Sequence, residues 1–273
     1  MSQKCDLCFR GCTLEEEKTG YCKVRTIKDG KNISRSYGLI SSAALDPIEK
    51  KPLAMFEPGT NILSVGGYGC NLSCPFCQNH EISQNDLYSS CERVSAEELV
   101  QSALKLKAYN NIGIAFTYNE PLINYEFIRD TFKLCKENGL KTVLVTSGAV
   151  SDKVLDEVLP LTDAWNIDLK AFTEKGYEDL RGNLPAVKNC IERAAKVSHV
   201  EITTLVVPGR NDSAEEMEEE AKWIASISPD IPLHLTRYFP RWKEKESPTE
   251  ISKLKELEAV AKKYLKYVFL GNI

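Results

Sequence analysis

The sequence predicts an α/β fold built around a parallel β-sheet. From residue 60 onward, short apolar runs rich in β-branched residues alternate with amphipathic helical patterns, and no linker or low-complexity tract interrupts them. This alternation implies parallel strands joined by right-handed crossovers, in a TIM-like barrel or in a doubly wound sheet. Periodicity alone does not choose between these two. The predicted strands are Ile62–Val65, Ile112–Thr117, Thr142–Thr146, Ala164–Asp168, Val200–Val206 and Pro232–Thr236, with a candidate last strand at Tyr267–Leu270.

The helices between these strands have readable start and stop signals. Ser95 with Glu98 forms a capping box before an apolar stripe, and Ser213 with Glu216 is expected to do the same. Gly139 should end the helix that precedes the third strand, because glycine accepts the left-handed conformation at C′.

Residues 1–59 differ from the alternating body of residues 60–273. They begin with closely spaced cysteines, and Pro47, Pro52 and Pro58 exclude a long helix near their end. We therefore expect a small Cys-rich N-terminal segment packed on one large barrel. The chain length of 273 residues suits a single core of this kind.

Composition and charge narrow the class of protein. The 42% apolar and 27% charged residues are typical of a globular protein. A net charge of −4, with Lys and Arg spread along the chain, argues against a nucleic-acid-binding surface. No apolar run approaches the length of a membrane span, and Met1–Arg10 lacks the apolar core of a signal peptide, so a cytoplasmic protein is expected. The acidic run Glu215–Glu220 is interpreted as a solvated helix face.

Ten cysteines must be explained in a reducing compartment, where disulfides are rare. Closely spaced cysteines there indicate metal or iron–sulfur ligation. The isolated Cys135 and Cys190 share helical faces with apolar residues, which predicts core packing. The two clusters are Cys5, Cys8, Cys12 and Cys22, and Cys70, Cys74 and Cys77; Cys91 is also isolated.

The second cluster directly follows the first predicted strand, at the face where parallel α/β folds place their active sites. Three thiolates at C-x3-C-x2-C suit a cubane cluster and leave one iron without a protein ligand. The alternative is a zinc site formed by Cys70, Cys74 and Cys77 with a distant fourth ligand such as His80.

At these residues the sequence resembles the radical S-adenosylmethionine (SAM) superfamily, whose signature places an aromatic residue, here Phe76, before the last cysteine. More broadly it resembles the radical SAM member of the AmmeMemoRadiSam system, a group related to pyruvate formate-lyase activating enzymes. The motifs of this resemblance are Asp46-Pro-Ile-Glu-Lys-Lys-Pro-Leu53, Pro58-Gly59, Cys77-Gln-Asn79, Ile82-Ser-Gln84, Thr117-Tyr-Asn-Glu-Pro121, Asn166-Ile-Asp-Leu-Lys170, Val207-Pro-Gly209 and Leu270-Gly-Asn272.

The resemblance implies a partial (β/α)6 barrel with a [4Fe–4S] cluster held by Cys70, Cys74 and Cys77. It further implies that SAM binds the unique iron and is cleaved by one-electron reduction to a 5′-deoxyadenosyl radical, which abstracts hydrogen from a substrate. An electron donor such as ferredoxin or flavodoxin and an association with a Memo-like protein are also implied. No nucleic-acid or membrane partner is expected.

The resemblance also assigns SAM-binding roles to polar residues at strand ends. Tyr118-Asn119-Glu120-Pro121 stands where the superfamily has Gly-Gly-Glu, with both glycines replaced. Asn119 and Glu120 are the expected SAM contacts there, and a turn or capping role is the alternative for both. Further contacts are expected from Thr146 and Ser147 after the third strand and from Asp168 and Lys170 after the fourth. A surface ion pair is the alternative for the last two.

Two sets of residues keep open roles. His234 and Arg237, near the end of the sixth strand, are candidates for substrate recognition, with a structural histidine as the alternative. Cys5, Cys8, Cys12 and Cys22 form a candidate second metal site, for zinc or for a second iron–sulfur cluster, and free thiols are the alternative.

The predicted function is a radical SAM enzyme that acts on an unidentified substrate. One alternative is an activase that places a glycyl radical on a partner protein. An alternative of another class is an iron–sulfur electron carrier or a zinc-binding module.

Overall fold

The computed structural model describes residues 2–273, in which eight strands form one sheet. Seven of them are parallel and adjacent in chain order, and β6 pairs antiparallel with β7 at one edge. A doubly wound sheet would reverse its strand order at a switch point, so this order is that of a barrel. β6 and β14 are the two edges, and the barrel is therefore open. The strands are β6 (Ser42–Pro47), β7 (Asn61–Gly66), β9 (Asn111–Phe116), β10 (Lys141–Thr146), β11 (Ala164–Asp168), β12 (His199–Val206), β13 (Leu233–Arg237) and β14 (Val268–Gly271).

The seven predicted strands are confirmed, each to within one residue at either end. β6 was not predicted. It ends at Pro47 and lies at the edge of the sheet, where a missing N–H costs no ladder hydrogen bond. Because β6 belongs to the main sheet, the predicted boundary after residue 59 does not coincide with the boundary of the sheet.

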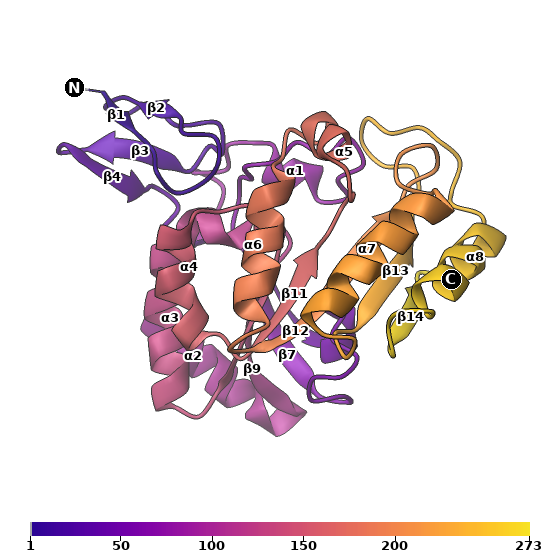
Figure 1. The fold of residues 1–273 in the computed structure, drawn as a ribbon. Helices are drawn as coiled ribbons and strands as arrows, with labels where there is room; N and C mark the ends of the chain where they lie inside the picture. The colour runs from indigo at the N-terminus through magenta and orange to yellow at the C-terminus, as the bar shows by residue number, and fades with distance from the viewer. Residues whose placement is uncertain (1) are drawn as a thin grey trace.

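The long helices cover one face of the sheet (Figure 1). The capping box of Ser95 and Glu98 is confirmed. The second predicted box is only half formed, because Ser213 caps its helix while Glu216 accepts a hydrogen bond from the Phe172 amide. The helices are α1 (His80–Ser83), α2 (Ala96–Lys105), α3 (Tyr125–Glu137), α4 (Asp152–Val158), α5 (Glu174–Asp179), α6 (Leu184–Ala194), α7 (Ala214–Ile227) and α8 (Ile251–Ala261), with short 3-10 turns at Ile48–Lys50, Leu106–Tyr109, Pro121–Asn124 and Leu159–Leu161.

The main apolar core lies between these helices and the sheet. Cys135 of α3 and Cys190 of α6 are fully buried in it, which confirms their prediction as core residues. Gly139 adopts a φ of +63° directly after α3, as predicted for the residue that ends this helix. No helix among residues 2–273 is both long and apolar enough to span a bilayer.

A second apolar cluster closes one end of the barrel interior. Ile48 and Leu53, from the segment after β6, pack with Ile62 of β7. Phe56 packs against the same cluster. The other inner-face members are Ala115, Val143 and Ala164. This segment fills the end opposite the loops that follow the strands, so the carboxyl ends of the strands are left for a functional site.

We call the segment that carries Ile48, Leu53 and Phe56 the plug. It is also anchored by Glu201, a fully buried residue of β12. Its carboxylate accepts hydrogen bonds from the amides of Ala54 and Met55 at 2.9 and 2.8 Å. It also lies 2.9 Å from His199 Nε2 and 2.6 Å from His234 Nε2. Burial alone would raise the pKa of Glu201, but these hydrogen bonds outweigh it and lower the pKa to about 2.

Glu220 of α7 corrects the prediction of a solvated acidic face. Its side chain is buried, and Thr204 Oγ1 donates to its carboxyl at 2.5 Å. Burial raises the pKa of Glu220 to about 8, because no cation faces it to offset the lost hydration. The acidic run Glu215–Glu220 is therefore only partly exposed to solvent.

Glu220→Gln should change how stability depends on pH. Between about pH 5 and 8 the unfolded chain has released this proton while the folded chain keeps it. The free energy of unfolding of the wild type therefore falls as pH rises, by up to about 1.4 kcal/mol per pH unit from this group. Urea unfolding at pH 5.5 and pH 8 should show the Gln variant gaining about 1–3 kcal/mol relative to wild type at the higher pH. The exposed Glu219→Gln is the control, and identical slopes for wild type and Glu220→Gln would contradict this account.

The N-terminal segment packs over α3, α4 and the carboxyl end of the sheet (Figure 1). Arg25 Nη1 contacts both carboxylate oxygens of Glu126 at 2.8 Å, and Leu7 O accepts from the Ser151 amide at 3.0 Å. Its strands are β1 (Gln3–Lys4), β2 (Thr13–Leu14), β3 (Arg25–Lys28) and β4 (Lys31–Ser34); β5 (Leu39–Ile40) pairs with β8 (Glu92–Arg93).

Candidate active site

The loop after β7 brings three cysteines together at the carboxyl end of the sheet. Cys74 is buried, and Cys70 and Cys77 are half-buried. Burial raises the pKa of Cys70, and Cys74 and Cys77 lie close enough to raise it further. Phe76 is buried in the main core and fixes the loop between the last two cysteines.

Side-chain amides hold this loop in place. Asn119 accepts from the Gly67 amide at 3.1 Å and donates to the carbonyls of Tyr68 and Gly69 at 3.1 and 3.0 Å. Asn79 donates to Tyr118 O at 2.8 Å. The structure thus places Asn119 on the backbone of the cysteine loop, where it acts as a brace. Its predicted contact with SAM stays a prediction.

Tyr118 adopts a backbone conformation that is typical of glycine, at a position where the superfamily motif has glycines. Its φ of +73° is left-handed, a conformation that glycine adopts freely and that costs other residues about 1–2 kcal/mol. Tyr118 Oη donates to Asp46 Oδ2 at 2.9 Å, and Lys51 Nζ contacts the same oxygen at 2.9 Å. These contacts hold Tyr118 in the glycine conformation. Sequence reasoning missed this interior group, although Asp46 and Lys51 lie within a quoted motif.

His80 is not a fourth ligand in this arrangement. Its Nδ1 lies 3.3 Å from Cys77 O, and its ring stacks on Trp242 with 5.5 Å between centroids. Among residues 2–273, no three His, Cys, Asp or Glu side chains converge on the position of a single metal ion. The contacts of His80 thus lie with Cys77 O and Trp242.

The three thiols fit an iron–sulfur cluster. Burial raises the pKa of Cys74 to about 12, against the opposing effect of the nearby Lys170 ammonium, and burial raises the pKa of Cys70 as well. A metal centre supplies the further positive charge that ionises buried thiol ligands. Three sulfurs on one loop without a fourth leave a coordination position open, as inner-sphere chemistry requires.

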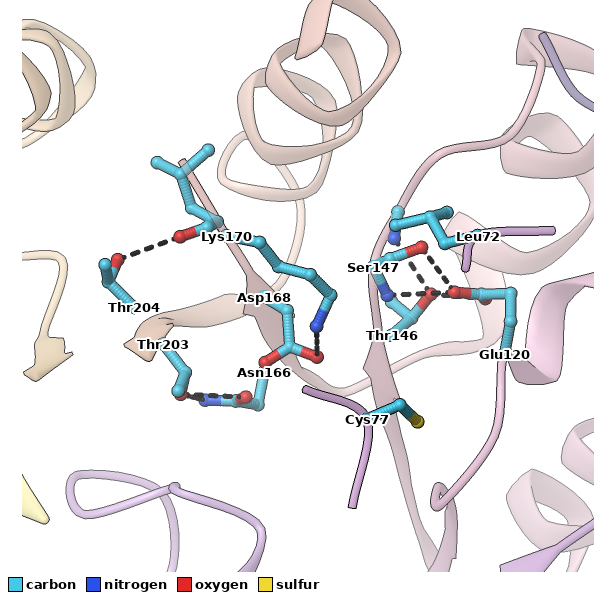
Figure 2. Close-up of polar contacts among 12 residues, drawn as sticks. Leu72, Cys77, Glu120, Thr146, Ser147, Asn166, Asp168, Lys170, Thr203 and Thr204 are labelled. Atoms are coloured by element: carbon cyan, nitrogen blue, oxygen red, sulfur yellow. Dashed lines mark hydrogen bonds and ion pairs between the residues drawn. The ribbon is translucent and has the colours of Figure 1, made fainter. Parts of the chain in front are cut away.

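Glu120, Thr146 and Ser147 form one buried group beside the cysteines (Figure 2). Glu120 Oε1 accepts from Thr146 Oγ1 at 2.6 Å, and Oε2 accepts from the Ser147 amide and hydroxyl at 2.9 and 2.6 Å. Glu120 also caps the following 3-10 turn through the Leu122 amide. The predicted residues are thus brought together, and the capping alternative for Glu120 is confirmed.

Asp168 and Lys170 form an ion pair at the end of β11 (Figure 2). Lys170 Nζ lies 2.9 Å from Asp168 Oδ2, and both side chains are partly buried. Burial by itself would lower the pKa of Lys170. The Asp168 carboxylate and the nearby Cys74 outweigh burial, raise this pKa and keep the ammonium charged. The pair therefore faces the cysteine loop and is not a surface ion pair.

The candidate substrate residues are engaged within the fold. His234 lies inside β13, is buried, and bonds Glu201 as described above. Arg237 Nε donates to Thr249 O at 2.8 Å, and its guanidinium lies over the ring of Phe239. The contact with Glu201 fits the structural alternative for His234, and a role in substrate recognition stays a prediction. Sequence reasoning could not find its partner, because Glu201 lies on the neighbouring strand.

Comparison with known proteins agrees with this geometry. The family model of the radical SAM superfamily matches residues 64–224. An uncharacterised protein of Methanocaldococcus jannaschii is 35% identical, over 99% of this chain and 81% of that protein. The pyruvate formate-lyase-activating enzyme of Clostridium pasteurianum is 30% identical, over 72% of this chain and 87% of that protein.

Solved structures share the fold. A domain of a pyruvate formate-lyase-activating enzyme from Bacteroides vulgatus has a TM-score of 0.52 at 22% identity and covers 59% of this chain and 99% of its own. Streptococcus suis SuiB bound to SAM has a TM-score of 0.61 at 13% identity, covering 78% of this chain and 52% of its own.

The chain belongs to the radical SAM superfamily, whose members bind an iron–sulfur cluster and SAM. Within the superfamily it is an enzyme homologous to the pyruvate formate-lyase activating enzymes. A simple electron carrier or zinc-binding module does not account for this membership.

Proposed function

We propose that this enzyme reductively cleaves SAM at a [4Fe–4S] cluster held by Cys70, Cys74 and Cys77. The observation that carries the proposal is the set of three thiols without a fourth ligand, at the carboxyl end of an open parallel barrel. The quoted motifs further support a place in the AmmeMemoRadiSam group.

The cluster and SAM, when bound, supply a 5′-deoxyadenosyl radical that abstracts hydrogen from a substrate. The residues of the chain bind and orient SAM. Lys170 presents a charged ammonium that complements the SAM carboxylate, and Asp168 fixes its position and can accept from SAM donor groups. Ser147 and Thr146 donate their hydroxyls to Glu120, which holds this polar group in place for a contact with SAM.

Water exclusion is a second task of the chain. The apolar plug of Ile48, Leu53 and Phe56 closes the far end of the barrel. The buried Phe76 and the braced cysteine loop limit motion around the cluster position. A reactive radical requires such shielding from solvent and other quenchers.

The proposed reaction needs partners. A one-electron donor such as ferredoxin or flavodoxin would supply the electron, and the substrate is a small molecule or a protein. The resemblance to the AmmeMemoRadiSam group adds a functional association with a Memo-like protein.

SAM binding tests the proposal. Anaerobic protein reconstituted with iron and sulfide should bind SAM in a calorimetric titration, with about one site per chain. The apo protein is the control and should bind it far more weakly, because the unique iron supplies the main anchor. Equal affinity with and without the cluster would contradict the proposed site.

A glycyl-radical activase is the second candidate. The observation that favours it is the 30% identity to the Clostridium pasteurianum activating enzyme over 72% of this chain. Incubation with SAM, reductant and a pyruvate formate-lyase would then produce the electron paramagnetic resonance (EPR) doublet of a glycyl radical. If that lyase shows no glycyl-radical doublet, the result contradicts the activase candidate. It does not contradict the cleavage of SAM.

A further inference from the structure

Four N-terminal cysteines surround one small cavity. Cys5, Cys8, Cys12 and Cys22 come from both ends of the β1–β2 hairpin and from the loop before β3, and together they line a cavity of about 20 Å³. Cys5 and Cys22 are buried, and the other two are half-buried. The apolar part of the lining comes from Leu7, Leu14 and Ile123.

A side-chain amide points at one of these sulfurs. Asn32 Nδ2 donates to the Cys5 sulfur at 3.5 Å. A neutral thiol is a weak acceptor, so a donor directed at sulfur favours a thiolate that ligates metal.

The arrangement suits a cluster better than a single ion. A zinc ion requires four sulfurs at about 2.3 Å from one point. Throughout the described residues, no group of His, Cys, Asp or Glu converges in that way. A cubane cluster spreads its thiolate ligands around a larger core than a single ion, so its ligands need not converge on one point.

This cavity adjoins the catalytic cysteine loop. A side chain at Gly69 would place its Cβ 2.2 Å from Cys22 O, so only glycine allows the two backbones to approach so closely. Arg10 Nε donates to Asn71 O at 2.6 Å. The buried Asn71, which follows Cys70 in the sequence, also donates through its side-chain amide to Ala149 O at 2.8 Å.

We propose that Cys5, Cys8, Cys12 and Cys22 bind a second iron–sulfur cluster that lies directly against the loop carrying Cys70. The four thiolates are the ligands, the apolar lining excludes water, and the hydrogen bond from Arg10 to Asn71 joins the two sites. This assignment goes beyond the proposed function and does not depend on it, because the two sets of ligands share no residue.

Iron content of the full chain tests the assignment. After anaerobic reconstitution with ferrous iron and sulfide, the wild type should hold about eight irons, and the Cys70→Ala, Cys74→Ala, Cys77→Ala triple variant should retain about four. The triple variant isolates this site, so its iron reports on the N-terminal ligands even if the proposed catalysis is wrong. No iron in the triple variant, or one zinc per chain in its place, would overturn the assignment.

A second pair of variants separates ligation from folding. Cys8→Ser with Cys12→Ser should lose about four irons while Cys91→Ser, a half-buried isolated cysteine, loses none. Full iron in the double variant would overturn the assignment. If the double variant does not fold, the triple variant still decides. In reduced wild-type protein, the EPR signals should be broadened relative to either variant, since the two sites are in contact; a simple sum of the separate signals would overturn the adjacency.

Discussion

Replacing Cys70, Cys74 and Cys77 together by alanine is expected to abolish SAM cleavage and to remove about four irons per chain. These thiols all lie on the loop at the carboxyl end of β7, and the positive charge of a metal centre would ionise the buried Cys74. Iron analysis, the visible absorbance of the cluster and product chromatography measure the effect.

The control is Cys135→Ala, which removes a buried cysteine from α3 without touching the site. It should lower stability through the small cavity it leaves, yet retain iron and activity. Wild-type SAM cleavage by the triple variant would show that the catalytic cluster is held elsewhere.

Asp168→Ala and Lys170→Ala are expected to weaken SAM binding without removing iron. Both residues face the cysteine loop, and neither is a cluster ligand. The loss of one charge-assisted contact costs about 1.5–3 kcal/mol, which corresponds to a roughly 10- to 150-fold rise in the Kd for SAM. Calorimetric titration of the reconstituted variants measures it.

A matched control lies on α5. Lys175 and Asp179 form an exposed ion pair of the same residue types, and their alanine variants should bind SAM like the wild type. Unchanged SAM affinity in both Asp168→Ala and Lys170→Ala would place the SAM carboxylate elsewhere. The Glu120 group would then have to supply the main anchor.

Much of the fold could be predicted because its signals are local. Apolar β-branched runs located seven parallel strands, and Ser95 and Gly139 located helix ends by their own backbone requirements. β6 was missed because Pro47 and the later prolines indicated irregular chain, and only the pairing with β7 makes it a strand. Glu220 was misjudged because its burial depends on Thr204 of another element.

Some parts of the candidate site could be predicted from local sequence signals, and others could not. The cysteine loop and the ion pair of Asp168 and Lys170 were predictable, since the carboxyl ends of parallel strands meet at one edge of a sheet. The brace formed by Asn119 and the left-handed backbone of Tyr118 were not. Both depend on contacts between residues about fifty or more positions apart, which no local pattern records.

The formation of 5′-deoxyadenosine tests the central claim most directly. Anaerobically reconstituted enzyme, SAM and a strong one-electron reductant should yield 5′-deoxyadenosine and methionine in equal amounts, measured by liquid chromatography. Omitting the reductant, or using the triple Cys70, Cys74 and Cys77 variant, should leave only background. Sustained absence of 5′-deoxyadenosine from wild-type protein that carries its full iron would contradict the account, as would formation at the wild-type rate by the triple variant.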